Sequence, residues 1–296
     1  RKILKDIEIF VLNGPIFFDV KIYNYFLDYN LIPIFNSLKE LKLWIRLESK
    51  NKKKIKIGLH FDTGMNRFGI PNVEIDKVKK LFEKKTFNLF CIMSHLSSAD
   101  EKNKKINLLQ KNLFNKINSD YKNVLLSIAN SSAIFNLKGF NFSFVRSGGA
   151  LFGINPTKNK NPMNNVISLH AKVLQIKNLK TESNKVVGYN STYQVNGALK
   201  IAVLGIGYAD GYPRNLSNIG YASFKNYKLP IVGTISMDYI TVDLSKLRKK
   251  IKVGDWVELI GKNISIQDVA FLSQTIEYEI LNNLGNRLQK YYIGKN

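Results

Sequence analysis

Short apolar runs alternate along the first half of the chain with longer stretches in which apolar residues recur every three or four positions. This alternation predicts strands connected by helices, the arrangement of a mainly parallel sheet. Two of the intervening segments, 37–47 and 73–85, carry a helical pattern, and Ser37 stands where an N-cap is expected. The expected strands are "IEIFVL" (7–12), "LIPIF" (31–35), "KIKIGLH" (54–60), "NLFCIMSH" (88–95), "NVLLSIAN" (123–130) and "FSFVR" (142–146).

Six parallel strands do not close a barrel, because the (β/α)8 barrel of the TIM type needs eight. Either the sheet is open, with two unpaired edges, or two βα units precede the first visible strand. The chain begins with Arg1 rather than Met. We therefore expect an α/β barrel domain over residues 1–160 that lacks its first two βα units.

The amino-acid composition changes at residues 155–165, a polar stretch rich in Pro and Asn that suggests a domain joint. Beyond it we expect a mainly antiparallel β domain over residues 161–296. Its expected strands are 168–180, 200–208, 229–235, 239–244 and 255–261, and its expected helices are 266–274 and 277–285.

The formal net charge of +23 raises the question of a nucleic-acid or anionic-membrane partner. Only seven of the 45 basic residues are Arg, and the lysines are scattered among Asn and Ile. Scattered lysine is typical of a solvated surface, and there is no clustered basic patch with interleaved aromatic residues. We predict no nucleic-acid partner, and a basic nucleic-acid-binding protein is the less favoured alternative.

Cys91 is the only cysteine, so the chain has no internal disulfide and suits a reducing compartment. No apolar run is long enough to span a membrane, and the first residues have no signal-like apolar core. We therefore expect a cytoplasmic protein without a membrane partner. The three histidines, His60, His95 and His170, lack the spacing of metal ligands, so no metal site is predicted.

Four polar clusters follow the later strands of the first half, where a barrel carries its working residues. Each alone is best explained as a loop with turn and cap residues, but together they suggest a site. The last two combine hydroxyls with exposed N–H groups and could cradle a phosphate. The clusters are "DTGMNR" (62–67), "SHLSSAD" (94–100), "ANSSA" (129–133) and "VRSGGALFG" (145–153).

These clusters are followed, in order, by "VGYNSTYQ", "GIGYADGYPR", "GTISMD" and "EYEILNNLGNR". The whole series resembles the fold-type III, pyridoxal-phosphate-dependent alanine racemases. The resemblance implies a pyridoxal 5'-phosphate cofactor, two-base interconversion of L- and D-alanine, a head-to-tail homodimer with two shared sites, and D-alanine supply for cell-wall peptidoglycan.

The resemblance also implies a set of cofactor contacts. Arg146 would donate to the pyridine nitrogen, and since an Arg has no acceptor and keeps its proton, the ring nitrogen would stay unprotonated. His95 would lie against the ring, and Arg67 would face the phenolic oxygen and the substrate carboxylate. The phosphate would be held by Ser131, Gly148 and Gly149, with Asn130 close by.

Three residues of the second half complete the implied site. Tyr189 matches the family's base for the L-enantiomer, while Tyr208 and Met237 match residues that line the substrate pocket and its entrance. Racemisation needs one acid/base group on each face of the α-carbon. Without the resemblance, ordinary packing in the β domain would explain all three side chains.

The sequence departs from the family pattern at the second base. That base is the lysine that binds the cofactor, carried in a Lys-Ala-x-x-Tyr-Gly type motif, and no such motif occurs here. We therefore predict that this polypeptide alone is inactive or poorly folded. His60 stands where the family commonly has a lysine, often carbamylated, that braces the arginine matching Arg67. The alternatives are a catalytically incomplete homologue that binds pyridoxal phosphate, and a racemase of another small amino acid such as serine.

Overall fold

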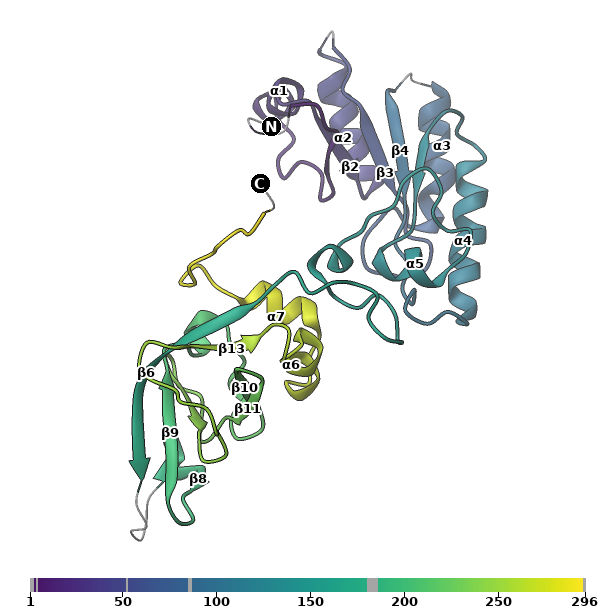
Figure 1. The fold of residues 1–296 in the computed structure, drawn as a ribbon. Coiled ribbons are helices and arrows are strands. Elements are labelled where there is room, and N and C mark those ends of the chain that lie inside the picture. Colours follow the sequence, from purple (N-terminus) through teal and green to yellow (C-terminus); the bar gives the residue numbers. More distant parts are fainter. Residues whose placement is uncertain (1–2, 4, 52, 85–86, 180–185, 295–296) are drawn as a thin grey trace. The chain divides into compact units, whose positions relative to one another are not determined.

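The computed structural model describes residues 3, 5–51, 53–84, 87–179 and 186–294. The chain folds into two compact units, each described here by itself (Figure 1). Unit 1 comprises Arg1–Gly148 and Pro156–Asn159, and unit 2 comprises Gly149–Asn155 and Lys160–Asn296. The expected joint between residues 160 and 161 stays a prediction.

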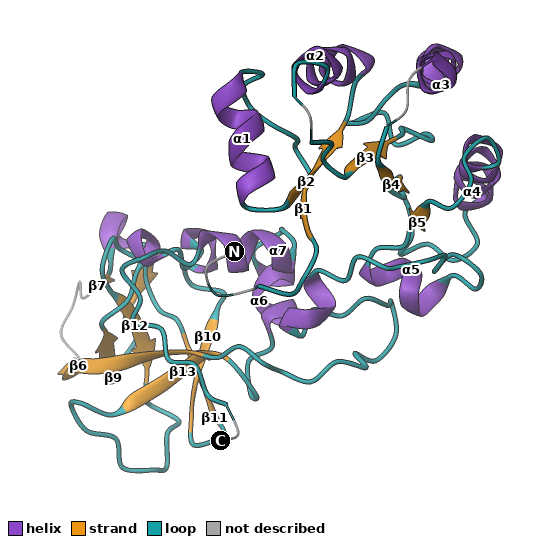
Figure 2. Ribbon diagram, turned by 90° about the horizontal axis from the view of Figure 1, so that it is seen from above, coloured by secondary structure: helices purple, strands orange, loops and turns teal. Residues whose placement is uncertain are grey.

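Unit 1 is built on a five-stranded parallel sheet whose strands follow one another in chain order. Figure 2 shows the strands as a curved row with the helices α1 to α4 along its outer side, which is the arrangement of half a barrel. The strands are β1 (Ile9–Val11), β2 (Leu31–Phe35), β3 (Ile57–His60), β4 (Leu89–Met93) and β5 (Leu125–Ser127), and the helices are α1 (Val20–Asp28), α2 (Leu38–Glu48), α3 (Ile75–Lys84), α4 (Lys105–Asn118) and α5 (Ser131–Asn136).

The expected sixth strand, 142–146, is wrong. Phe142 has a φ of 35°, which is outside the extended region. The next two backbone N–H groups both donate to the carbonyl oxygen of Leu126, while the Ser143 hydroxyl accepts from the Leu126 N–H at 3.0 Å. A side chain therefore takes the place of a regular ladder beside β5, and a single bridge joins Asn130 to Arg146.

The predicted helix at 37–47 is confirmed as α2. Ser37 Oγ accepts from the Glu40 N–H at 3.2 Å, and Glu40 Oε2 accepts from the Ser37 N–H at 3.2 Å, which is a capping box. The segment 73–85 begins as a 3₁₀ turn, η1 (Asn72–Glu74), before α3, and its residue 85 lies outside the described residues.

The core of unit 1 lies between the sheet and its helices. Trp44 of α2 is fully buried, and its ring centroid lies 5.0 Å from that of Tyr23 and 5.6 Å from that of Phe35. Cys91 is buried in a smaller cluster with Ile32 and Ile34. Burial raises the pKa of its thiol to about 12, so this thiol is protonated and unreactive in the folded state.

Unit 2 contains a six-stranded antiparallel sheet in the order β11-β10-β13-β6-β9-β12. A bridge between Ile231 and Val242 brings its two outer strands together. Its strands are β6 (Leu169–Leu179), β9 (Leu199–Leu204), β10 (Tyr221–Phe224), β11 (Tyr227–Pro230), β12 (Ile240–Asp243) and β13 (Trp256–Ile260), beside the small pair β7 (Val186–Val187) and β8 (Tyr193–Gln194). Its helices are α6 (Ile266–Leu272), α7 (Glu277–Asn283), and the 3₁₀ turns η2 (Gly149–Phe152), η3 (Tyr189–Ser191), η4 (Tyr208–Asp210) and η5 (Arg214–Leu216).

Two expected strands of unit 2 are shorter than predicted. The strand expected at 200–208 ends at Leu204, although the Gly205 N–H still donates to the Lys172 carbonyl of β6 at 3.0 Å. The strand expected at 229–235 ends at Pro230, and Gly233 beyond it has a φ of +79°. Strand β10 was not predicted. The strand expected at 168–180 is confirmed as β6, with residue 180 outside the described residues.

Candidate functional site

The loop after β3 is a closed turn that presents Arg67. Its two ends are joined by the Ile70 N–H, which donates to the His60 carbonyl at 2.8 Å, and by the Asp62 N–H, which donates to the Ile70 carbonyl at 2.9 Å. One carboxylate oxygen of Asp62 accepts three successive backbone N–H groups at 2.9 to 3.1 Å, those of Gly64, Met65 and Asn66. The loop is thus ordered by its own Asp, and it leaves Arg67 exposed.

The loop after β4 is tied to the first loop and to α4. Thr63 Oγ1 and Ser94 Oγ lie 2.6 Å apart, and Gln110 Nε2 donates to the His95 carbonyl at 2.9 Å. Burial lowers the pKa of His95 to about 4, with the positive charges of Arg146 and Arg67 acting in the same direction. His95 is therefore a neutral ring at pH 7.

Arg146 lies at the centre of the unit 1 residues. Its Nη1 donates to Ser127 Oγ at 2.7 Å and to the Ser127 carbonyl at 3.1 Å, and its Nη2 donates to the Ser94 carbonyl at 2.5 Å. His95 Nδ1 lies 3.4 Å from Nη2. Burial lowers the pKa of Arg146 to about 10, and none of the ion pairs among the described residues includes it. This guanidinium is thus held by neutral oxygens.

The loop after β5 brings two of the predicted phosphate residues together. Ser131 Oγ accepts from the Gly148 N–H at 2.9 Å, and no heavy atom lies within 4 Å of the position a Cβ would take on Gly148. Asn130 caps α5 by accepting from the Ala133 N–H at 3.0 Å, so its side-chain oxygen is already engaged.

Gly149 has a different environment from Gly148. It belongs to unit 2, is buried in η2, and packs so closely on the Tyr278 ring that no Cβ fits. Packing against Tyr278 therefore accounts for this glycine without a ligand.

The three predicted residues of unit 2 are gathered by one loop, residues 232–237. The Tyr208 N–H donates to the Ser236 carbonyl at 3.1 Å, and the Ala209 N–H donates to the Met237 carbonyl at 3.0 Å. Thr234 Oγ1 donates to the Tyr189 carbonyl at 3.1 Å. All three side chains are exposed, with exposed fractions of 67% for Tyr189, 42% for Tyr208 and 53% for Met237.

Three supporting residues were missed in the sequence. Asn36 Oδ1 accepts a hydrogen bond from His60 Nδ1 at 2.8 Å. Gln110 holds the β4 loop, and Arg287 pairs with two carboxylates of unit 2. A signal existed for Asn36, which directly follows the buried strand "LIPIF" at the edge where the other polar clusters lie. Gln110 and Arg287 lie on a helix and near the C-terminal end, and no local pattern marks them.

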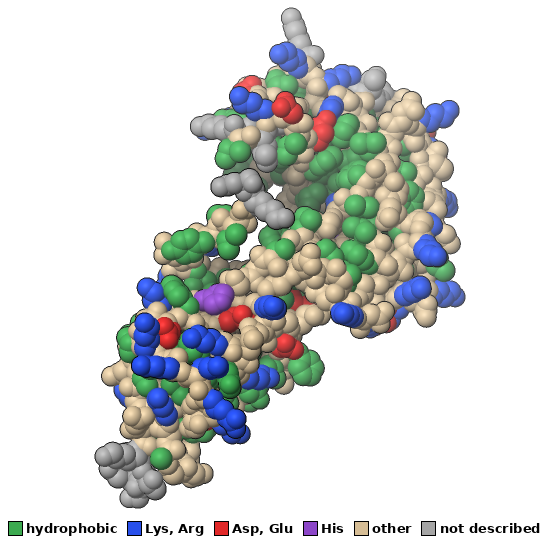
Figure 3. Space-filling model, viewed as in Figure 1, with side chains coloured by type: hydrophobic (Ala, Val, Ile, Leu, Met, Phe, Trp, Pro, Cys, Tyr) green, Lys and Arg blue, Asp and Glu red, His purple; other side chains and the backbone are tan. Residues whose placement is uncertain are grey.

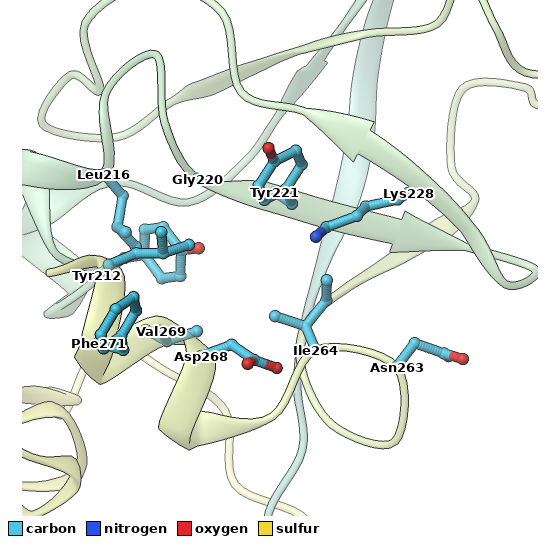
Figure 4. Close-up of a pocket in the computed structure, with 11 residues that line it drawn as sticks. Tyr212, Leu216, Gly220, Tyr221, Lys228, Asn263, Ile264, Asp268, Val269 and Phe271 are labelled. Atoms are coloured by element: carbon cyan, nitrogen blue, oxygen red, sulfur yellow. The ribbon is translucent and has the colours of Figure 1, made fainter.

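A cavity of about 190 Å³ lies in unit 2 between β10 and α6 (Figure 4). Lys228 and Asp268 lie on opposite sides of it. Lys228 Nζ stands 3.8 Å from the Tyr221 ring centroid, and Asp268 is engaged in the N-terminal cap of α6 with Ser265. None of the predicted site residues lines this cavity, so it is distinct from the candidate site.

Within the described ranges, no group of three or more His, Cys, Asp or Glu side chains is placed to hold a metal ion. A search of the same residues finds no helix with the length and apolar character of a membrane span. Lys and Arg side chains appear on the visible faces of both units, with hydrophobic side chains and uncharged surface between them (Figure 3).

The family model of the alanine racemase N-terminal domain matches residues 1–156, and that of the alanine racemase C-terminal domain matches residues 166–292. The chain belongs to the alanine racemase family. The expected loss of a preceding segment is not borne out by this match. The fold expectation of a barrel-type α/β domain followed by an antiparallel β domain is confirmed, with five parallel strands in the described half barrel.

Individual relatives agree with the family match. The alanine racemase of Rickettsia bellii (strain RML369-C) is 37% identical over 297 residues, which cover 99% of this chain and 71% of the relative. A crystal structure of alanine racemase from Bartonella henselae with covalently bound pyridoxal phosphate is 36% identical, with a TM-score of 0.89, and the match covers 98% of this chain and 80% of that one. The biosynthetic alanine racemase of Pseudomonas aeruginosa, at 24% identity and a TM-score of 0.89, supports the fold alone, with 99% of this chain and 81% of that one covered.

Proposed function

We propose that this chain is a pyridoxal-phosphate-dependent racemase that interconverts L- and D-alanine. The observation that carries the proposal is Arg146, a half-buried guanidinium that neutral oxygens fix in place at the edge of the half barrel. Family membership and the alanine racemases of similar sequence and structure support it.

The residues of unit 1 fit the cofactor. A pyridine nitrogen is a hydrogen-bond acceptor, and Arg146 is a donor that keeps its proton at pH 7. Ser131 and the Gly148 N–H stand side by side with open space over the glycine, which suits a phosphate group. Neutral His95 suits contact with an aromatic ring. When bound, the cofactor supplies an electron sink that acidifies the α-hydrogen of an amino acid.

The remaining proposed roles concern residues that act on the substrate. Arg67 binds the substrate carboxylate, and its exposed guanidinium on an ordered loop is suited to an anion. Tyr189 takes the α-proton of the L-enantiomer and, in the opposite direction, donates a proton to the α-carbon when the L-enantiomer forms. Tyr208 and Met237 line the pocket and its entrance. These assignments leave the second base unassigned.

The exposure of Tyr189, Tyr208 and Met237 supports a head-to-tail homodimer in which both subunits contribute to each of two shared sites. We further propose that the protein acts in the cytoplasm and that the D-alanine serves peptidoglycan synthesis. A substrate wider than alanine, such as serine, is the near alternative within this activity.

One observation favours a second candidate, a homologue that binds the cofactor without racemising alanine. The sequence contains no Lys-Ala-x-x-Tyr-Gly motif, and thus no lysine matched to the cofactor-binding base. The two candidates differ in whether any lysine of this chain becomes joined to the cofactor.

Borohydride reduction of the purified chain with pyridoxal phosphate, followed by peptide mapping, tests this difference. Stoichiometric labelling of one lysine, together with racemisation of alanine that is lost in Tyr189→Phe, would support the racemase. Cofactor binding without a specific label or activity would support the second candidate. If pyridoxal phosphate binds the unvaried chain no better than it binds Arg146→Ala, both candidates would be contradicted.

A further inference from the structure

Gln110 is a fully buried amide on the inner face of α4. It shares this face with Phe114 and Ile117, which pack in the core of unit 1. An amide in such a position is destabilising unless its donor and acceptor groups are hydrogen-bonded. The partners of Gln110 therefore show what a buried amide does at this point of the helix.

Both ends of the Gln110 amide are bonded to the loop after β4. Nε2 donates to the His95 carbonyl at 2.9 Å and to Thr63 Oγ1 of the preceding loop at 3.4 Å. Oε1 accepts from the Ser97 N–H at 3.0 Å and from Ser97 Oγ at 3.1 Å. A carbonyl only accepts and a backbone N–H only donates, so these partners fix which end of the amide is the donor. A carboxylate lacks the donor and an apolar side chain lacks both groups.

The backbone that Gln110 holds is the backbone that borders Arg146. The Ser94 carbonyl accepts from Arg146 Nη2 at 2.5 Å, and His95 Nδ1 lies 3.4 Å from the same atom. Thr63 Oγ1 in turn lies 2.6 Å from Ser94 Oγ. The contacts of one helix side chain thus converge on the two residues that meet the Arg146 guanidinium.

We propose that Gln110 is a positioning residue that holds the backbone of residues 94–97 so that the Ser94 carbonyl and the His95 ring meet the Arg146 guanidinium. This inference rests on the proposed function, in which Arg146 and His95 bind pyridoxal phosphate. Hydrogen bonds weaken steeply when their length and angle change, so a small displacement of this loop loosens Arg146. The expected result of losing the amide is weaker cofactor binding as well as lower stability.

Asn107 provides a matched control on the same face of α4. It lies three residues before Gln110 and is similarly buried, and its Nδ2 donates to the Ser98 carbonyl at 3.1 Å and to the Glu101 carbonyl at 2.9 Å. Asn107 therefore holds the later part of the loop, beyond the residues that border Arg146. Asn107→Leu and Gln110→Met each replace a buried amide by an apolar side chain of similar size. A purely structural role would make the two variants alike.

Nitrogen NMR of the full chain, labelled with ¹⁵N in its histidine rings, tests the positioning without cofactor or activity. A guanidinium only donates, so His95 Nδ1 is the acceptor in its contact with Arg146 and the proton of the neutral ring is on Nε2. We expect the His95 Nδ1 resonance, assigned by comparison with His95→Gln, to shift in Gln110→Met and to stay unchanged in Asn107→Leu. An unchanged resonance in Gln110→Met, or equal shifts in both variants, would overturn the inference.

Titration of the same variants with pyridoxal phosphate provides the second readout. We expect the Kd to rise roughly tenfold in Gln110→Met, as for the loss of one hydrogen bond to a charged group, and to change little in Asn107→Leu. Urea midpoints measured alongside should fall in both variants, because each loses hydrogen bonds of a buried amide. Equal increases of the Kd in both variants would indicate loss of stability alone and would contradict the positioning role.

The two readouts separate this inference from the proposed function. If the unvaried chain does not bind pyridoxal phosphate, the proposed function fails, while the His95 resonance in Gln110→Met still decides whether Gln110 positions the loop. If the unvaried chain and Gln110→Met bind the cofactor equally well, the inference fails and the proposed function stands.

Discussion

Arg287 Nη2 lies 2.5 Å from Asp238 Oδ1, and Arg287 Nε lies 3.4 Å from the second carboxylate, Asp210 Oδ1. Asp210 Oδ2 in turn accepts from the Gly207 N–H at 2.9 Å. Gly207 directly precedes Tyr208, and Asp238 directly follows Met237. One arginine near the C-terminal end therefore connects the two loops that carry the proposed pocket residues of unit 2.

Replacing Arg287 by Gln should affect catalysis more than stability. The side chains of Arg287 and Asp238 are 53% and 41% exposed, and exposed ion pairs contribute only about 0 to 1 kcal/mol. Loosening the two loops should lower kcat/KM for alanine several-fold while the urea midpoint changes little. Arg248→Gln, at another exposed arginine of unit 2, is the matched control. An equal loss of kcat/KM in both variants would contradict the connecting role.

Gly211 should tolerate no side chain. Its φ is +95°, and a Cβ there would overlap the carbonyl oxygen of Asn283 at the end of α7. Gly254 has a similar φ of +92° but no heavy atom within 4 Å of the Cβ position. We expect Gly254→Ala to lower the free energy of unfolding by about 1 to 2 kcal/mol, the cost of the left-handed backbone alone. Gly211→Ala should cost clearly more in the same urea titration, and equal costs would show that α7 moves aside freely.

Ser127→Ala should lower the free energy of unfolding, because Ser127 holds the Arg146 guanidinium. Ser127 is fully buried, and its hydroxyl accepts from Arg146 Nη1 at 2.7 Å. Its loss leaves a buried charged donor short of one partner, which costs about 1 to 3 kcal/mol. Ser119→Ala, which removes an exposed hydroxyl bonded to the Lys116 carbonyl, is the control and should cost less. Urea unfolding measures both, and equal destabilisation would argue against a special role of Ser127.

Stability should fall as the pH is lowered from about 6.5 towards 4. His60 and His95 have folded-state pKa values lowered from 6.5 to about 4, so across this range the unfolded chain binds protons that the folded chain does not. Each histidine would contribute up to about 3 kcal/mol, fully present above pH 6.5 and lost on acidification. Urea midpoints measured between pH 8 and pH 4 test this.

The matched variants for this pH dependence are His60→Gln and His170→Gln. The first should flatten the dependence between pH 6.5 and 4, because one of the two buried rings no longer gains a proton on unfolding. The second removes an exposed histidine of β6 and serves as the control for the substitution itself. Identical slopes in the unvaried chain and His60→Gln would show that His60 is not buried in neutral form.

Much of the fold follows from local pattern, because strands and helices that bury one face leave a periodic trace. Ser37 and the apolar face behind it predicted α2, and the apolar runs predicted β2, β6 and β13 within a few residues. The segment at 142–146 has the apolar alternation of a strand but not its ladder, because Phe142 is turned out of the extended region and Ser143 bonds the neighbouring backbone. Such competition between side chain and main chain leaves no periodic signal.

The candidate site was predictable in its polar clusters and not in its supports. "DTGMNR" predicted an ordered turn, and Asp62 indeed accepts three backbone N–H groups there. Gly148 and Gly149 are adjacent in the sequence, and both were predicted to hold the phosphate. Gly149 instead packs on Tyr278, more than a hundred residues away. Asn36 and Gln110 likewise act across loops, so their contacts depend on the tertiary fold.

The Cys91 thiol is a natural reporter of the local unfolding of unit 1. It is the only thiol, and it lies fully buried in unit 1, where burial keeps it protonated. A thiol reagent therefore reacts at the rate at which the half barrel exposes β4, and nothing in unit 2 contributes to the signal. The opening of unit 1 can thus be measured separately from that of unit 2, without introducing a label.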